Sequence, residues 1–144
     1  MSILRLAKAP AAAVPPSATV LDAVRKMKEA DVGAVVVLDG GALQGMFSER
    51  DVMLRIVLEN KDPQITKVKD VMTTNVVAIR KDTKPEDAVH LMWERHIRHL
   101  PVVCEDGRVE GIVEIRNLFH EQIADMCQQL DSLESYLATD GIGG

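Results

Sequence analysis

The chain has 144 residues, of which 47% are hydrophobic and only 3% aromatic, so it can form one domain or two small fused units around an aliphatic core. A protein that stacks single-stranded nucleic-acid bases needs more aromatic rings than this. The net charge is −5, and from Leu118 onward the chain carries five acids and no Lys or Arg, which leaves no basic surface for nucleic acid.

The sequence favours neither a membrane span nor a secreted protein. No apolar run reaches the ~18 residues that a membrane span needs. Residues 1–16 hold one apolar patch that an early proline interrupts, so we expect no signal peptide. Cys104 and Cys127 belong to no CxxC or Cys/His cluster, and we expect both to stay reduced. These features predict a cytoplasmic protein.

An internal repeat is the most informative feature of the chain. Segments of the first half resemble segments of the second half in the same order: Thr19–Met27 and Thr83–Met92, Val35–Gly45 and Pro101–Gly111, Ser48–Asp51 and Glu114–Asn117. The offset is 64 residues at Thr19 and 66 from Val35 onward. Two single-residue insertions account for the drift, so the pattern predicts a duplicated unit.

Each unit is predicted to contain the order β-α-β-β-α. In the first unit the elements are a strand near Ala13–Val14, a helix after Thr19, a hairpin of Val35–Leu38 and Leu43–Phe47, and a helix from about Arg50. In the second unit they are a strand at Val76–Ile79, a helix after Thr83, a hairpin of Pro101–Cys104 and Val109–Val113, and a helix from about Arg116. One such unit is marginal alone, so the two should share a core in a mixed α/β (α+β) fold.

Local signals predict where the first helix of each unit begins. Thr19 precedes Asp22 by three residues, and Thr83 precedes Glu86 by three; both pairs fit the reciprocal hydrogen bonds of a capping box. Pro85 is compatible with a first helical turn.

The last helix is predicted to carry an apolar seam. Six residues are spaced 4, 3, 4, 3 and 4 apart: Phe119, Ile123, Met126, Leu130, Leu133 and Leu137. This is the a/d spacing of a coiled coil over about three heptads. The seam should pack against a second subunit or back on its own module, and we expect a homodimer. The alternative is an intramolecular helix that only covers the core.

These patterns predict four parts of the chain. We expect a first repeat at residues 1–61, a linker at 62–75, a second repeat at 76–120, and an amphipathic helix with a frayed end at 121–144.

The ordered set of motifs resembles a tandem pair of cystathionine β-synthase (CBS) domains, the Bateman module. The resemblance rests on Val68–Ile79, on Asp-Ala-Val with a following Met in both first helices, on Ile97–Val103, on Asp106–Val113 and on Gly45–Asp51. The first strand of the first repeat departs from this pattern. The resemblance implies two repeats related by a pseudo-twofold axis, and a non-catalytic cleft between them for an adenosyl ligand such as AMP, ADP, ATP or S-adenosylmethionine.

Arg98 and His99 stand directly before a buried apolar strand. A cation at the mouth of a cleft is stabilised when it meets a phosphate. The resemblance implies that a basic residue at this position reaches ligand phosphates, and we expect this role for Arg98, together with His99. In the alternative, Arg98 pairs with a surface acid and His99 packs in its neutral form.

Ser48 and Asp51 lie at a predicted strand-to-helix turn. A carboxylate there can accept hydrogen bonds from both hydroxyls of a ribose, and the resemblance implies that role for Asp51. Helix capping by the same two residues is the alternative, and both roles can coexist. Arg50, in the same motif, completes this part of the expected ligand set.

The second repeat replaces these residues by Glu114 and Asn117, and the first repeat has Gly33 and Ala34 where the second has Arg98 and His99. The resemblance implies that the ribose acid of one repeat shares a ligand with the basic pair of the other. We therefore expect one good site, which combines Asp51 with Arg98 and His99, and one degraded site around Asn117.

The predicted function is a regulatory sensor, not an enzyme, that binds an adenine nucleotide and shifts the conformation of an unidentified partner protein. No cofactor is expected to be obligatory, although Mg²⁺ is compatible with a nucleotide. His96 and His99 lack a third ligand for a metal. The alternative is a structural dimerisation module with decayed sites; a small enzyme that uses His99 and Asp51 has little support.

Overall fold

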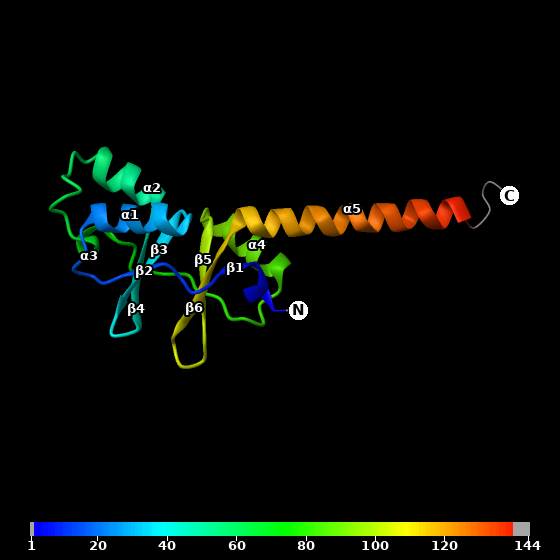
Figure 1. Ribbon diagram of the computed structural model, residues 1–144, viewed down its shortest axis with the longest axis horizontal. Helices are drawn as coiled ribbons and strands as arrows, with labels where there is room; N and C mark the ends of the chain where they lie inside the picture. Colours follow the sequence, from blue (N-terminus) through cyan, green and yellow to red (C-terminus); the bar gives the residue numbers. More distant parts are fainter. Residues whose placement is uncertain (1, 140–144) are drawn as a thin grey trace.

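The computed structural model describes residues 2–139. The chain forms two α+β halves side by side, each around a three-stranded sheet, with one long helix that extends away from them (Figure 1). The predicted fold class is therefore confirmed. No helix within residues 2–139 is long and apolar enough to cross a membrane.

The first half has the predicted order of elements. They are β2 (Ala13–Val14), α1 (Val20–Ala30), β3 (Ala34–Asp39), β4 (Ala42–Ser48), α2 (Glu49–Asp51) and the π-helix η2 (Val52–Val57). The sheet order is β2-β3-β4, with β2 parallel and β4 antiparallel to β3. Buried Val35, Val37 and Phe47 from this hairpin pack with Val20 and Met27 of α1 in the first core.

The second half has a similar arrangement, but its third strand comes from a different part of the chain. It contains α4 (Pro85–Arg95), β5 (His99–Val103), β6 (Val109–Glu114) and α5 (Ile115–Thr139). Its sheet order is β1-β6-β5, and the third strand, β1 (Ala7–Lys8), comes from the N-terminus of the chain. The predicted strand at Val76–Ile79 is wrong, because only Ile79 forms a bridge, to Val102.

The two predicted capping boxes have different outcomes. Thr19 and Asp22 form the reciprocal pair of hydrogen bonds at the start of α1, at 3.1 and 3.0 Å, which confirms the prediction. Thr83 is not the cap of α4, whose N-cap is Lys84 with Pro85 as its first residue. The Thr83 hydroxyl accepts a hydrogen bond from the Arg80 amide instead, so a local turn uses it.

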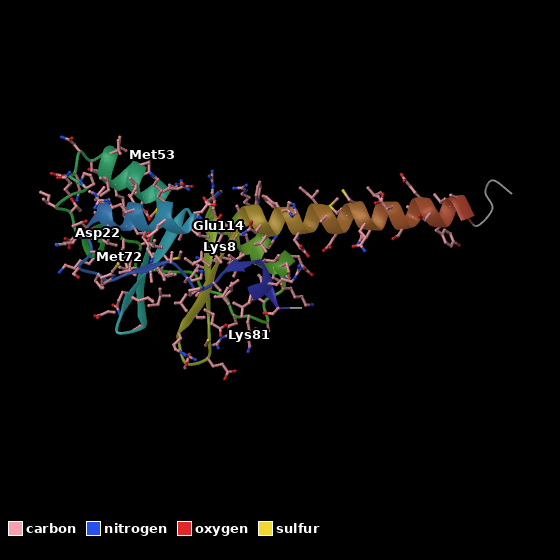
Figure 2. The ribbon with its side chains drawn as sticks, in the orientation of Figure 1. Lys8, Asp22, Met53, Met72, Lys81 and Glu114 are labelled. Carbon is pink, nitrogen blue, oxygen red and sulfur yellow. The ribbon has the colours of Figure 1, made fainter. Side chains whose placement is uncertain are left out.

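The two halves exchange the segments that precede their sheets. The 3-10 helix η1 (Ile3–Leu6) and β1 lie against the second half, where Ile3 is fully buried in the second core and Ala7 pairs with Val113. The short helix α3 (Val68–Val71) packs into the first core, and Thr73 bridges to Met46. Figure 2 shows Met72, which lies between α3 and Thr73, on the side of the first half. Each half therefore completes the other.

Two glycines allow these exchanged segments to approach. A side chain at Gly45 would lie 2.7 Å from the Thr73 carbonyl oxygen, and one at Gly111 would lie 2.8 Å from the Lys8 carbonyl oxygen. Real Cβ atoms do not come this close to backbone. The two glycines occupy equivalent hairpin positions, so the crossing obeys the pseudo-twofold symmetry.

The strand register corrects the sequence alignment of the repeats. Val36 pairs with Met46, and Pro101 pairs with Ile112. Val36, rather than Val35, is thus equivalent to Pro101, and the second insertion lies in the hairpin turn, after the first strand of each hairpin.

The predicted last helix forms and leaves its seam uncovered by its own module. Leu118 of α5 is fully buried in the second core, whereas Ile123 and Met126 are each 61% exposed. The alternative in which this helix only covers the core is therefore wrong. The frayed end predicted for the tail falls at residues 140–144, outside the described residues.

Candidate functional site

A cavity of about 720 Å³ lies between the two halves, and both halves line it. Five of the six expected site residues line it: Ser48, Arg50, Asp51, Arg98 and His99. Its apolar lining comes from Ala34, Met46, Met53, Val76, Val77 and Ile97. A cavity of this volume with few polar groups among apolar side chains is typical of a small-molecule site.

Ser48 and Asp51 are held at the end of β4 by a capping box. The Asp51 carboxylate accepts a hydrogen bond from the Ser48 amide at 2.9 Å, and the Ser48 hydroxyl accepts one from the Asp51 amide at 3.4 Å. The capping alternative is therefore present in the structure. It also fixes the position of the carboxylate at the cavity wall.

Asp51 retains acceptor capacity. The Ser48 amide and hydroxyl both donate to its Oδ2. The Nε of Arg55 lies 3.5 Å from its Oδ1. A carboxylate offers about four acceptor positions, so a ligand hydroxyl can still bind. Arg55 is itself held by the carbonyls of Val71 and Met72, to which it donates at 2.8 and 3.0 Å.

Arg98 contributes a guanidinium to the cavity wall. It lies in the short connection from α4 to β5, where His96 ends the helix in the left-handed conformation, with φ 55°. Within residues 2–139 its exposed side chain makes no hydrogen bond or ion pair. The alternative in which it pairs with a surface acid is not what the structure shows. Arg50, by contrast, donates to the His96 carbonyl at 3.3 Å and links the two halves.

His99 lies between carboxylates of both halves. Its side chain is 12% exposed, with Nε2 3.8 Å from Glu114 Oε1. Burial lowers the pKa of His99, while Glu114 and Glu49 oppose that effect and Arg98 adds to it. His99 therefore favours the neutral form, as the packing alternative proposed, and an anionic ligand group would favour the charged form.

The pseudo-equivalent position in the second repeat is arranged differently. Asn117 is absent from the lining of this cavity. Glu114, which stands in the place of Ser48, accepts a hydrogen bond from the Gly33 amide at 3.4 Å. A side chain at Gly33 would lie 3.0 Å from His99 Nε2, so His99 fills the space beside it. Figure 2 shows Glu114 at this junction of the halves.

Several lining residues were not identified from the sequence: Glu49, Met53, Thr73, Asn75 and His96. Glu49 lies inside the Ser48–Asp51 motif, so its position between two predicted site residues could have indicated that it lines the cavity. Thr73 and Asn75 reach the cavity only because the segment that holds them crosses to the first half. No group of three or more His, Cys, Asp or Glu residues within the described chain is arranged to hold a metal ion.

A family model for the CBS domain matches residues 5–58 and again residues 68–124. This chain belongs to the CBS-domain family. Its tandem pair of CBS repeats confirms the resemblance described above.

Known relatives of this CBS pair are found in bacteria and plants. The chain is 38% identical over 114 residues to CBS domain-containing protein YhcV of Bacillus subtilis, covering 79% of this chain and 80% of that protein. It is 34% identical over 124 residues to CBS domain-containing protein CBSX3, mitochondrial, of Arabidopsis thaliana, covering 83% of this chain and 60% of that protein. The chain thus spans less than two thirds of CBSX3.

The fold matches solved CBS structures as well. The crystal structure of the CBS domain protein NE2398 superposes with a TM-score of 0.78 at 30% identity, covering 85% of this chain and 98% of that chain.

Proposed function

We propose that this CBS pair is a regulatory module that binds an adenosyl ligand between its repeats and does not catalyse a reaction. One observation carries the proposal: the cavity wall combines a positioned carboxylate of the first repeat, Asp51, with an unpaired guanidinium of the second, Arg98. Apolar side chains between them suit an adenine ring, Asp51 suits the ribose hydroxyls, and Arg98 with His99 suits a phosphate.

Binding at this position would act on both repeats at once. A ligand that contacts both halves stabilises the arrangement of the repeats that it fits best, and so shifts the population of conformations. The module would in this way act on a partner protein. The CBS pair of protein MJ0100 is described in complex with 5-methylthioadenosine and S-adenosyl-L-methionine; that protein is 19% identical to this chain, so the likeness is one of fold.

Asymmetry between the two repeats supports one ligand per chain. In the second repeat Glu114 and Asn117 replace Ser48 and Asp51, and the Glu114 carboxylate is engaged by Gly33 and His99. We propose that this position is degraded. The same replacement favours the alternative function, a dimerisation module with decayed sites, if the first position also proves empty.

Thermal unfolding with a ligand panel tests the proposal. The panel is AMP, ADP, ATP and S-adenosylmethionine, each with Mg²⁺ and with EDTA. A ligand at 100 times its dissociation constant adds about 2.7 kcal/mol to the free energy of unfolding. We expect one ligand to raise Tm in the wild type and to lose that effect in Arg98→Ala.

The matched control is Arg95→Ala, because Arg95 is exposed on α4 and does not line the cavity. It should keep the full shift. No shift with any ligand at millimolar concentration contradicts the sensor and favours the structural module, and turnover of a nucleotide would contradict the absence of catalysis.

A further inference from the structure

The seam of α5 is a long exposed apolar stripe. Its six members, Phe119, Ile123, Met126, Leu130, Leu133 and Leu137, are each between 42% and 61% exposed. Exposed apolar stripes of this continuity mark an interaction surface. In Figure 1 the helix runs outward from the module, and its far half has no other element beside it.

The helix does not need a partner in order to form. Ile115 and Leu118 pack in the second core, and Arg5 forms an ion pair with Glu121 one turn further on. The costly first turns are therefore already fixed. The seam is what remains without a partner, and it begins at Phe119, directly beside the anchored turn.

The charges of α5 are placed away from the seam. With Phe119 at position d, Glu121, Asp125 and Asp131 fall at positions f, c and b, and only Glu134 falls beside the seam, at e. A basic partner would find most of the acids on the side opposite the seam. A second copy of α5 can approach the seam without bringing those acids together. Its a and d residues have the same spacing as those of the first copy, so the two seams can pack against each other.

The layers favour an antiparallel pair. Parallel two-stranded coiled coils prefer β-branched residues at a and Leu at d. Here the a positions are Ile123, Leu130 and Leu137, and the d positions are Phe119, Met126 and Leu133. Only Ile123 fits that preference at a. An antiparallel pair centred on Gln128 instead places each a residue opposite a d residue.

That register also has favourable flanks. It sets Phe119 against Leu137 of the partner subunit, and His120 beside Glu134 of the partner subunit. The helix dipoles then oppose each other favourably. A parallel pair would set Glu134 beside the uncharged Gln129 of the partner subunit, and the two helix dipoles would point in the same direction.

We propose that α5 pairs with α5 of a second copy of this chain in an antiparallel two-helix coiled coil centred on Gln128. The twofold axis passes through that centre, and the two CBS modules stand at opposite ends. This proposal is independent of ligand binding.

The role of the seam is tested by placing a glutamate either in the seam or on the outer face of α5. Leu130→Glu introduces a carboxylate into the centre of the seam, whereas Gln128→Glu introduces the same group on the outer face. Light scattering should give a dimer mass for the wild type and for Gln128→Glu, and a mass half as large for Leu130→Glu. Met126→Glu should repeat the loss. Both seam positions are exposed, so each variant should keep the folded module and unfold cooperatively, with Tm lowered only by the stabilisation that dimerisation adds. A monomeric wild type, or a Leu130→Glu dimer, overturns the proposal.

Spin labels test the orientation. Ala138→Cys and Gln128→Cys, each in a Cys104→Ser and Cys127→Ser background, carry one label per chain. In the antiparallel pair residue 138 of one copy lies level with residue 118 of the other. The two labels at residue 138 are therefore about 30 Å apart along the axis of the coiled coil, at 1.5 Å per residue. Labels at position 128 are level in either orientation and serve as the control. A distance at position 138 as short as the one at position 128 shows a parallel pair and overturns the antiparallel arrangement.

Discussion

His99 lies in the wall of the cavity between the two halves of the module. Burial lowers its pKa below the usual value of about 6.5. The unfolded chain therefore binds more protons than the folded chain at pH values just below 6.5. The stability that neutral His99 contributes is fully present above that pH and is lost as pH falls toward the lowered pKa.

We predict that His99→Gln weakens this pH dependence. Denaturant unfolding at steps from pH 7.5 to pH 5.5 should show the free energy of unfolding falling more steeply in the wild type than in the variant. Asp22 and Asp106, whose pKa values are lowered by hydrogen bonds, titrate below this range. The control is His90→Gln, because the His90 side chain is 74% exposed. Equal slopes for wild type and His99→Gln would contradict the prediction.

At the scale of residues, short-range motifs could identify part of the site. Ser48 and Asp51 are three residues apart, and Arg98 and His99 are adjacent, so their placement depends mainly on one turn each. Thr73 and Asn75 could not be identified, because their place in the cavity depends on a segment that pairs with Met46 of the other half. No local pattern encodes that pairing.

The cap of α1 is the clearest property at the scale of elements. Thr19→Ala removes the hydroxyl that accepts from the Asp22 amide, and we expect it to lower the free energy of unfolding by about 1 kcal/mol. Thr83→Ala is the matched control in the second repeat, since Thr83 does not cap α4. It should cost clearly less in the same denaturant titration. A larger loss for Thr83→Ala would restore the capping role that the sequence suggested.

The two helices show why one element could be predicted and another could not. Thr19 has both halves of a capping box within four residues, and no competing turn uses its hydroxyl. Thr83 has the same spacing to Glu86, but its hydroxyl accepts a hydrogen bond from the Arg80 amide in a local turn and does not cap the helix. The strand expected at Val76–Ile79 failed for a different reason: apolar character alone does not supply a pairing partner, and only Ile79 has one.

The exchange of segments is the main property of the whole molecule. Ile3 is fully buried in the second core although it opens the first repeat, and Val68 is fully buried in the first core although it precedes the second. Ile3→Ala should destabilise the chain by about 2–5 kcal/mol.

Hydrogen exchange locates the effect. We predict that Ile3→Ala lowers protection chiefly in β5 and β6, and that Val68→Ala lowers it chiefly in β3 and β4. Each variant is the control for the other. Loss of protection in the half that carries the substituted residue in sequence order would contradict the exchange.

The same exchange governs the order in which the chain can fold during synthesis. β1 is made roughly 100 residues before its partner Val113, and this is a long-range contact of the kind that slows folding. The N-terminal strand must therefore wait, unpaired, until nearly the whole module has emerged. The first sheet, by contrast, has all three of its strands available once β4 is complete. The second sheet, whose order is β1-β6-β5, can therefore be completed only after β6 has been made.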